Sequence, residues 1–161
     1  MPCGMQRPPK VRHIIEIDRW RFDYYFGVND VSVIDKAYLD HRSIEIEGPI
    51  VEPVAIKAKK AKVTLTPSDG LIEAAKQSKR RFGDRLGASS EPREISPVGY
   101  VHYRSAEYSA NLFFPSDMLQ PILIMLWADQ YKYVLFEAAK GGNDAAIYNF
   151  ELLKRRRERT G

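Results

Sequence analysis

The chain has 161 residues, of which 44% are hydrophobic and 29% charged, and its formal net charge is +4. This composition fits one folded domain with a proper core and excludes an intrinsically disordered chain. Its single cysteine, Cys3, excludes an internal disulfide framework. The longest apolar run, 122–128, is too short to span a bilayer, and residues 1–10 lack the apolar stretch of a signal peptide. We therefore expect a cytoplasmic protein with no membrane partner.

The first half of the chain predicts a disordered lead-in over residues 1–10 and then strands. Residues 11–18 alternate weakly, whereas 19–26 alternate with the most regular period of two in the sequence. We expect one face of this second strand to lie in the core and the other face to be polar. The apolar face consists of Trp20, Phe22, Tyr24 and Phe26, and the polar face of Arg19, Arg21, Asp23 and Tyr25.

The middle of the chain predicts short strands and then a helix. Shorter apolar or alternating stretches predict strands at 31–34, 43–47, 50–56 and 57–66. Thr66 can cap a helix and Pro67 suits its first turn, and apolar residues then recur every three or four positions. We therefore predict a helix over 67–86 inside a basic insertion that spans 67–97.

The last third of the chain predicts two hairpins on either side of a helix. Residues 98–103 and 107–114 form the first hairpin. Asp117 then begins a helix over 117–128, provided that Pro121 lies in its first turn, and the alternative is a fully buried strand from Ile122. The run 140–144 contains Gly-Gly-Asn-Asp, which is typical of a turn between two strands. On the following strand we expect the inward side chains to be Ala146, Tyr148, Phe150 and Leu152.

These elements amount to seven to nine short strands with one or two helices, and no βα unit repeats. The sequence therefore predicts a mainly β (α+β) fold, an antiparallel sandwich or an open barrel. We expect one domain over 11–153, followed by a basic tail over 154–161.

Catalytic and cofactor motifs are absent from the sequence. The histidines, His13, His41 and His102, are not at metal-ligand spacing, and a lone cysteine cannot build a thiolate zinc site. The chain contains no nucleophile elbow and no glycine-rich phosphate loop. We therefore predict no metal and no cofactor. A small enzyme whose site combines these histidines with carboxylates is the third hypothesis.

Positive charge is concentrated in two segments. Residues 57–93 hold ten Lys or Arg and four Asp or Glu, and 154–159 hold five and one, so the remainder has a net charge of 10 − 16 = −6. Such asymmetry favours contact with a polyanion, and nucleic-acid association is the second hypothesis. Its candidate contacts are Lys59, Lys60, Lys79, Arg80, Arg81, Arg155, Arg156 and Arg157.

The first hypothesis is a non-enzymatic β-rich domain that binds a protein or small molecule, with homo-oligomers also expected. Sheet domains bind partners on a face or at loop ends. The face that carries Arg19, Arg21 and Tyr25 is the candidate contact surface, because Arg and Tyr are enriched where protein interfaces form.

Overall fold

The longest strand, β3 (Tyr38–Glu52), pairs along one edge with two strands, one after the other. The computed structural model describes residues 9–28, 38–72, 96–140 and 144–156. β1 (Lys10–Glu16) pairs antiparallel with the end of β3, and β2 (Arg19–Val28) pairs antiparallel with residues 38–47. β1 and β2 therefore form one bent strand that follows β3.

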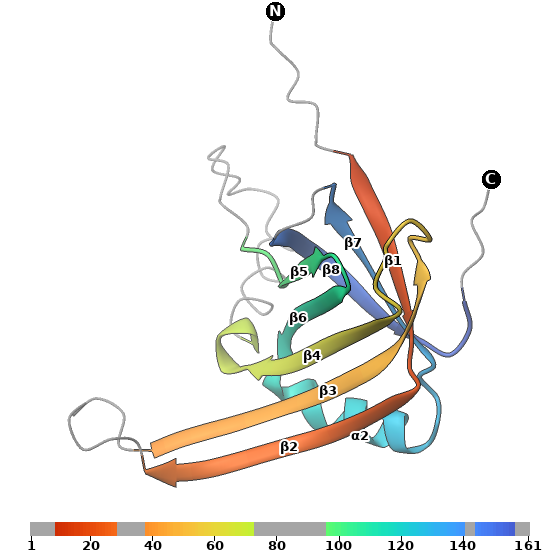
Figure 1. Cartoon of the computed structure of the whole chain (residues 1–161). Helices are drawn as coiled ribbons and strands as arrows, with labels where there is room; N and C mark the ends of the chain where they lie inside the picture. The colour runs from red at the N-terminus through yellow and green to blue at the C-terminus, as the bar shows by residue number, and fades with distance from the viewer. Residues whose placement is uncertain (1–8, 29–37, 73–95, 141–143, 157–161) are drawn as a thin grey trace, which may run out of the picture.

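Closure of the sheet at β3 produces a seven-stranded barrel with β2 left outside it (Figure 1). The barrel order is β1-β7-β8-β5-β6-β4-β3, and the β1–β3 pairing completes the ring. All neighbouring pairs are antiparallel except β4–β6. The remaining strands are β4 (Lys60–Ser68), β5 (Gly99–Arg104), β6 (Glu107–Pro115), β7 (Tyr133–Ala139) and β8 (Ala145–Leu153).

The mainly β class is confirmed, as are its number of strands and its one or two helices. The structure adds that the barrel is closed and includes one parallel pair. Alternate side chains of its strands fill the interior, as a small barrel requires. The fully buried members of this core include Ile15, Ile44, Ile46, Val63, Leu65, Leu112, Val134 and Phe136.

A 3₁₀ turn, η1 (Ser116–Met118), continues into α2 (Leu119–Trp127), close to the helix predicted over 117–128. Pro121 lies in the first turn of α2, where its missing N–H is not needed. The N-cap residues are Pro115 for η1 and Met118 for α2, and neither makes a side-chain capping hydrogen bond, so Asp117 is not the residue that caps the helix. Ile122 and Leu126 are buried in the core, and α2 lies at the lower end of the barrel in Figure 1. None of the described helices is long and apolar enough to cross a membrane.

The helix predicted over 67–86 begins later than expected. β4 continues through Ser68, and the described chain is helical only over 69–72. Pro67 stays in the strand because the pairing of β4 with β3 ends at Leu65, so only the β6 side of the strand is occupied there. The rest of this helix and most of the insertion fall outside the described residues, as do residues 1–8, the strand at 31–34 and residues 157–161.

The inward face of β8 differs from the prediction in its first half. Ala145 and Ile147 are buried, whereas Tyr148 is exposed. The register of β8 against β7 shifts between Phe136 and Ala138, and an irregularity of this kind reverses which alternate residues face the core. Phe150 and Leu152, beyond the shift, pack against the core as expected.

Gly48 allows the bend between β1 and β2 to lie close to the main chain of β3. A Cβ atom at this position would lie 1.6 Å from the main-chain oxygen of Glu16. Replacing Gly48 with alanine should therefore lower the free energy of unfolding by about 2 kcal/mol or more, because backbone atoms must move to make room. Chemical denaturation measures this loss. Gly70→Ala is the matched control, because its added Cβ meets only a side-chain atom at 3.9 Å. Equal losses for the two variants would contradict the close approach.

Candidate interaction surface

The outer part of the β2–β3 hairpin extends beyond the last β3–β4 pair, Ile44 with Leu65, as a two-stranded ribbon, which we define as residues 22–28 and 38–43 (Figure 1). The expectation that its apolar face lies in the core was wrong for Phe22, Tyr24 and Phe26, which are exposed. Trp20 alone packs against the core. The physical reason is the closure of the barrel through β1 and β3, because the described residues form a single sheet and no second sheet covers this face.

The outer edge of β2 has no strand beside it in the described part of the chain. β7 pairs with β1 only as far as Tyr133, opposite Glu16. The residues that precede β7 form α2 and the turn that follows it, so β7 does not continue along β2. β2 has ten residues and contains neither proline nor lysine, which are residues that hinder pairing at an edge. Natural proteins usually cover or pair such an edge.

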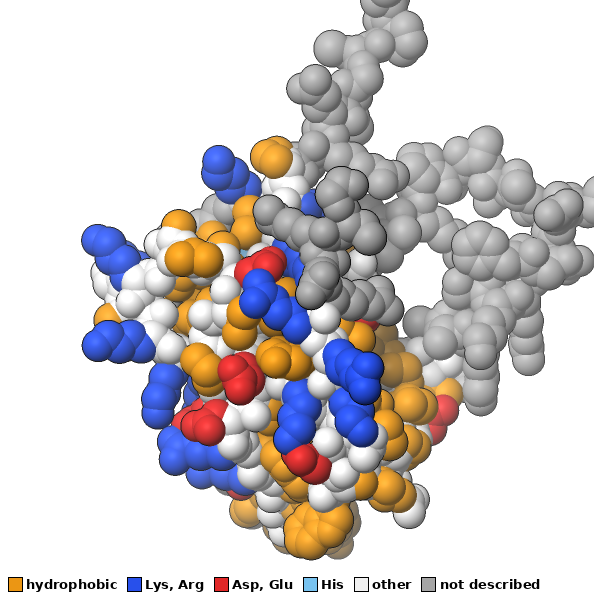
Figure 2. All heavy atoms as spheres, turned by 90° about the vertical axis from the view of Figure 1, so that its right-hand side faces the viewer, with side chains coloured by type: hydrophobic (Ala, Val, Ile, Leu, Met, Phe, Trp, Pro, Cys, Tyr) orange, Lys and Arg blue, Asp and Glu red, His pale blue; other side chains and the backbone are white. Residues whose placement is uncertain are grey.

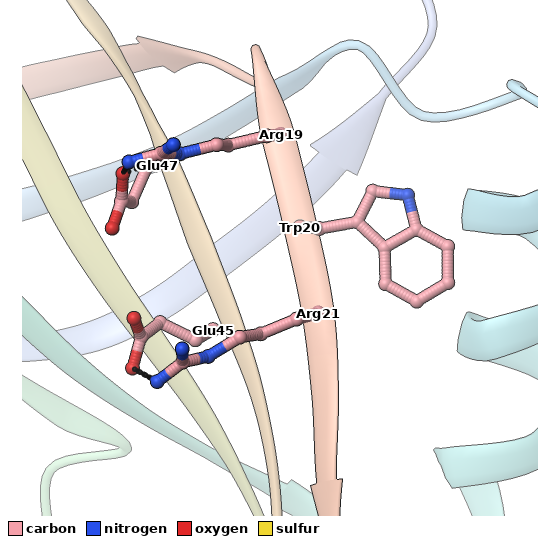
Figure 3. A pocket seen from close by; sticks show the side chains of 5 residues that line it. All are labelled: Arg19, Trp20, Arg21, Glu45 and Glu47. Atoms are coloured by element: carbon pink, nitrogen blue, oxygen red, sulfur yellow. Dashed lines mark hydrogen bonds and ion pairs between the residues drawn. The ribbon is translucent and has the colours of Figure 1, made fainter.

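Figure 3 shows that Arg19 and Arg21 point over β3, whereas Trp20 points in the opposite direction, toward α2. Arg19 Nε donates a hydrogen bond to Glu47 Oε2 at 2.6 Å. The hydrogen bond from the guanidinium lowers the pKa of the Glu47 carboxyl below its usual range. These side chains line an open hollow of about 220 Å³ together with Glu45.

The polar face continues as a ladder of ion pairs across three strands. Arg21 Nη2 lies 3.3 Å from Glu45 Oε2, and Lys62 Nζ on β4 lies 3.1 Å from the same oxygen. Arg21 Nε also lies 3.0 Å from Asp23 Oδ2 on its own strand. The two arginines predicted to contact a partner are thus both engaged by carboxylates of this chain. Tyr25, the third predicted residue, is exposed opposite His41.

The aromatic face of the ribbon carries one ring stack and one ion pair. Phe26 stacks on Tyr38 of β3, with ring centroids 5.5 Å apart and an interplanar angle of 8°. Arg42 Nη2 donates to Asp40 Oδ2 at 2.7 Å, and this bond lowers the pKa of Asp40. Tyr24 and Phe26 each remain 59% exposed despite these neighbours. The ribbon therefore presents a largely aromatic surface to solvent.

A second exposed apolar surface lies on α2. All residues of this helix except Gln120 are apolar, yet Ile124 is exposed and Trp127 is 83% exposed. A helix that is apolar on all sides is typically buried on all sides. Figure 2 shows apolar side chains gathered at the bottom of the molecule, the level at which α2 lies in Figure 1. Sequence reasoning missed this surface, although the absence of a polar face in 119–127 was a signal for it.

The three histidines lie in three different settings. His13 is buried in the barrel, where its ring stacks on Phe136 with centroids 5.0 Å apart. His41 is on the ribbon, beside a second hollow of about 150 Å³. The Nδ1 atom of His102 lies 3.6 Å from Asp144 Oδ1 on the outside of the barrel. Within the described ranges, no three His, Cys, Asp or Glu side chains group closely enough to hold a metal ion.

The candidate nucleic-acid contacts are only partly described, because Lys79, Arg80, Arg81 and Arg157 fall outside the described residues. Lys59 and Lys60 are exposed at the start of β4, and Arg155 is also exposed. Arg156 Nη2 donates a hydrogen bond to Glu52 Oε1 at 2.9 Å. In the view of Figure 2, Lys and Arg side chains are interspersed with acidic and apolar ones. Nucleic-acid association stays a prediction.

Comparison of the chain with protein-family models, with curated proteins and with solved structures gave no match in any of the three.

The buried His13 makes stability depend on pH. Burial lowers the pKa of His13 from 6.5 to about 4, because an apolar interior disfavours the charged ring. The unfolded chain therefore binds a proton between pH 6.5 and 4 that the folded chain does not bind. The free energy of unfolding should fall as the pH is lowered through this window, by up to about 1.4 kcal/mol per pH unit.

A paired substitution isolates this contribution. The hydroxyl oxygen of Tyr108 lies 2.8 Å from Nδ1 of His13, so replacing both residues with phenylalanine removes both polar groups together. Denaturation measured from pH 7 to pH 4 should show a shallower acid dependence for the double variant. Tyr108→Phe alone is the control, since it retains His13 and should retain the steep dependence. An unchanged slope in the double variant would contradict the assignment to His13.

Proposed function

We propose that this chain is a non-enzymatic interaction domain that docks onto a protein partner through the β2–β3 ribbon. The single observation that carries the proposal is the aromatic face of β2, which the closed barrel leaves in solvent. Aromatic residues and arginine are the types enriched where proteins bind each other. Exposed apolar side chains that gather on one part of a surface mark binding sites more often than isolated ones do.

The ribbon also offers hydrogen bonds to a partner. Each residue of an edge strand directs its N–H and C=O groups either toward its neighbour strand or away from it, so half of these groups on β2 face outward. An extended segment of a partner can pair with them while its side chains contact the aromatic face. This mode combines main-chain affinity with side-chain specificity.

The opposite, polar face of β2 is a less favourable docking surface than the aromatic face. Arg19 and Arg21 already bind Glu47 and Glu45, so a partner on that face must compete with bonds formed within the chain. Within the described part of the chain, the side chains of Tyr24 and Phe26 form no hydrogen bond or ion pair that a partner would have to replace. Burial of an exposed aromatic side chain contributes on the order of 2 kcal/mol. The aromatic face and the free edge therefore provide the larger gain on binding.

Substitution of the ribbon tests this proposal. We expect the double variant Tyr24→Ser, Phe26→Ser to lose at least about tenfold of its protein capture from an extract of the native host, because two aromatic contacts are worth more than about 1.4 kcal/mol. Quantitative mass spectrometry of proteins held on immobilised variants measures the loss. Tyr148→Ser is the matched control, since Tyr148 is exposed to a similar degree on β8. If both variants capture the same proteins in the same amounts as the native chain, the ribbon is not the docking surface.

A further inference from the structure

We propose that the partner of the ribbon is a second copy of this chain, which pairs antiparallel along the outer edge of β2 with Phe22 opposite Phe22. This inference rests on the proposed function and specifies its occupant. The edge of β2 would then be paired in a two-fold symmetric dimer, in which both copies use the same surface. The result is a sheet that continues from one barrel to the other.

The charges of β2 select this register. When Phe22 faces its own copy, Arg21 of each chain, which already contacts Asp23 of its own strand, also lies opposite Asp23 of the other chain, so two further opposite-charge pairs form across the two-fold axis. In the next register with the same faces aligned, in which one strand slides by two residues, Arg21 lies opposite Arg21. If the strand slides by two residues in the other direction, Asp23 lies opposite Asp23. Directly opposite like charges destabilise an antiparallel pair, whereas opposite charges stabilise it.

The same register matches the aromatic face. Residues that lie opposite each other in an antiparallel pair point to the same side of the sheet. Trp20 of each chain therefore lies beside Tyr24 of the other, with the two Phe22 rings between them. A register displaced by a single residue would place aromatic side chains opposite charged ones, and it would bury the wrong face.

The exposed surface of α2 gains a neighbour in this arrangement. Trp20 points toward α2 of its own chain (Figure 3), and the partner's Tyr24 lies beside Trp20 on the same side. The ribbon of each copy thus extends along the α2 side of the other copy. There it approaches the helix that exposes Ile124 and Trp127. Both uncovered apolar surfaces of the described chain are then accounted for by one contact.

A scan of single cysteines tests the register in the full chain with Cys3 replaced by serine. Phe22→Cys should form a disulfide-linked dimer under mild oxidation, because directly paired residues have Cα atoms about 4.5–5.5 Å apart, within the range of a disulfide. Phe26→Cys is the matched control. In this register its two copies lie eight residues apart along the strands, about 27 Å, and should not link. Linkage through residue 26 but not through residue 22 would overturn the register.

A charge exchange tests the pairing of Arg21 with Asp23. The variant Asp23→Arg places two arginines opposite two arginines, and Arg21→Asp places two aspartates opposite two aspartates. Each variant alone should dimerise at least about tenfold more weakly than the native chain. An equimolar mixture should recover dimers, because each arginine then lies opposite an aspartate. Sedimentation velocity measures the species, and circular dichroism confirms that each variant is folded.

The outcomes separate this inference from the proposed function. A native chain that stays monomeric at all accessible concentrations overturns the second copy as occupant. If Tyr24→Ser, Phe26→Ser nevertheless loses capture of a different protein, the ribbon remains the docking surface. A dimer that neither charge variant weakens also overturns the inference, because its interface then lies elsewhere.

Discussion

The shared edge of β3 is the constraint on which the rest of this structure depends. β1 and β2 follow one another along that edge, and among the described strands only β1 has a further strand, β7, on its other side. The barrel therefore closes at β1, and the chain continues past the closure as β2. Gly48 makes the crossing possible, because the main-chain oxygen of Glu16 occupies the place of a side chain. A strand with an apolar face and a free edge is the direct consequence of this closure.

The buried His13 and the exposed Arg21 have different roles. Inside the barrel, burial keeps His13 uncharged at neutral pH, and its Nε2 atom has no hydrogen-bond partner among the described residues. This residue reports on acid stability rather than on binding. Outside the barrel, Arg21 binds Glu45 and Asp23 at the surface, where salt bridges add little to the stability of a monomer. Such charges contribute more to the choice of partner and register than to the fold.

Period-two alternation predicted most strands within a few residues and the mainly β class, because alternation follows directly from the pleat of a strand. It could not predict which apolar face is covered. Tyr24 and Phe26 alternate as regularly as core residues do, and only the order of strands around the barrel shows that no described strand lies over them. The face of β8 was wrong at Tyr148 for a related reason, because one register shift depends on the neighbouring strand. The candidate contact residues Arg19 and Arg21 were placed on the correct strand, but their ion pairs depend on long-range pairing with β3.

Amide hydrogen exchange along β2, measured at several protein concentrations, tests the central claim most directly. If a second strand pairs with the free edge, the amides of alternate β2 residues should be protected at high concentration and lose protection on dilution. The amides of β1 and β7, which are paired within the barrel, should not respond to dilution. Exchange of the β2 amides that is equally fast at all concentrations, with no other protein present, would contradict pairing of this edge with a second copy.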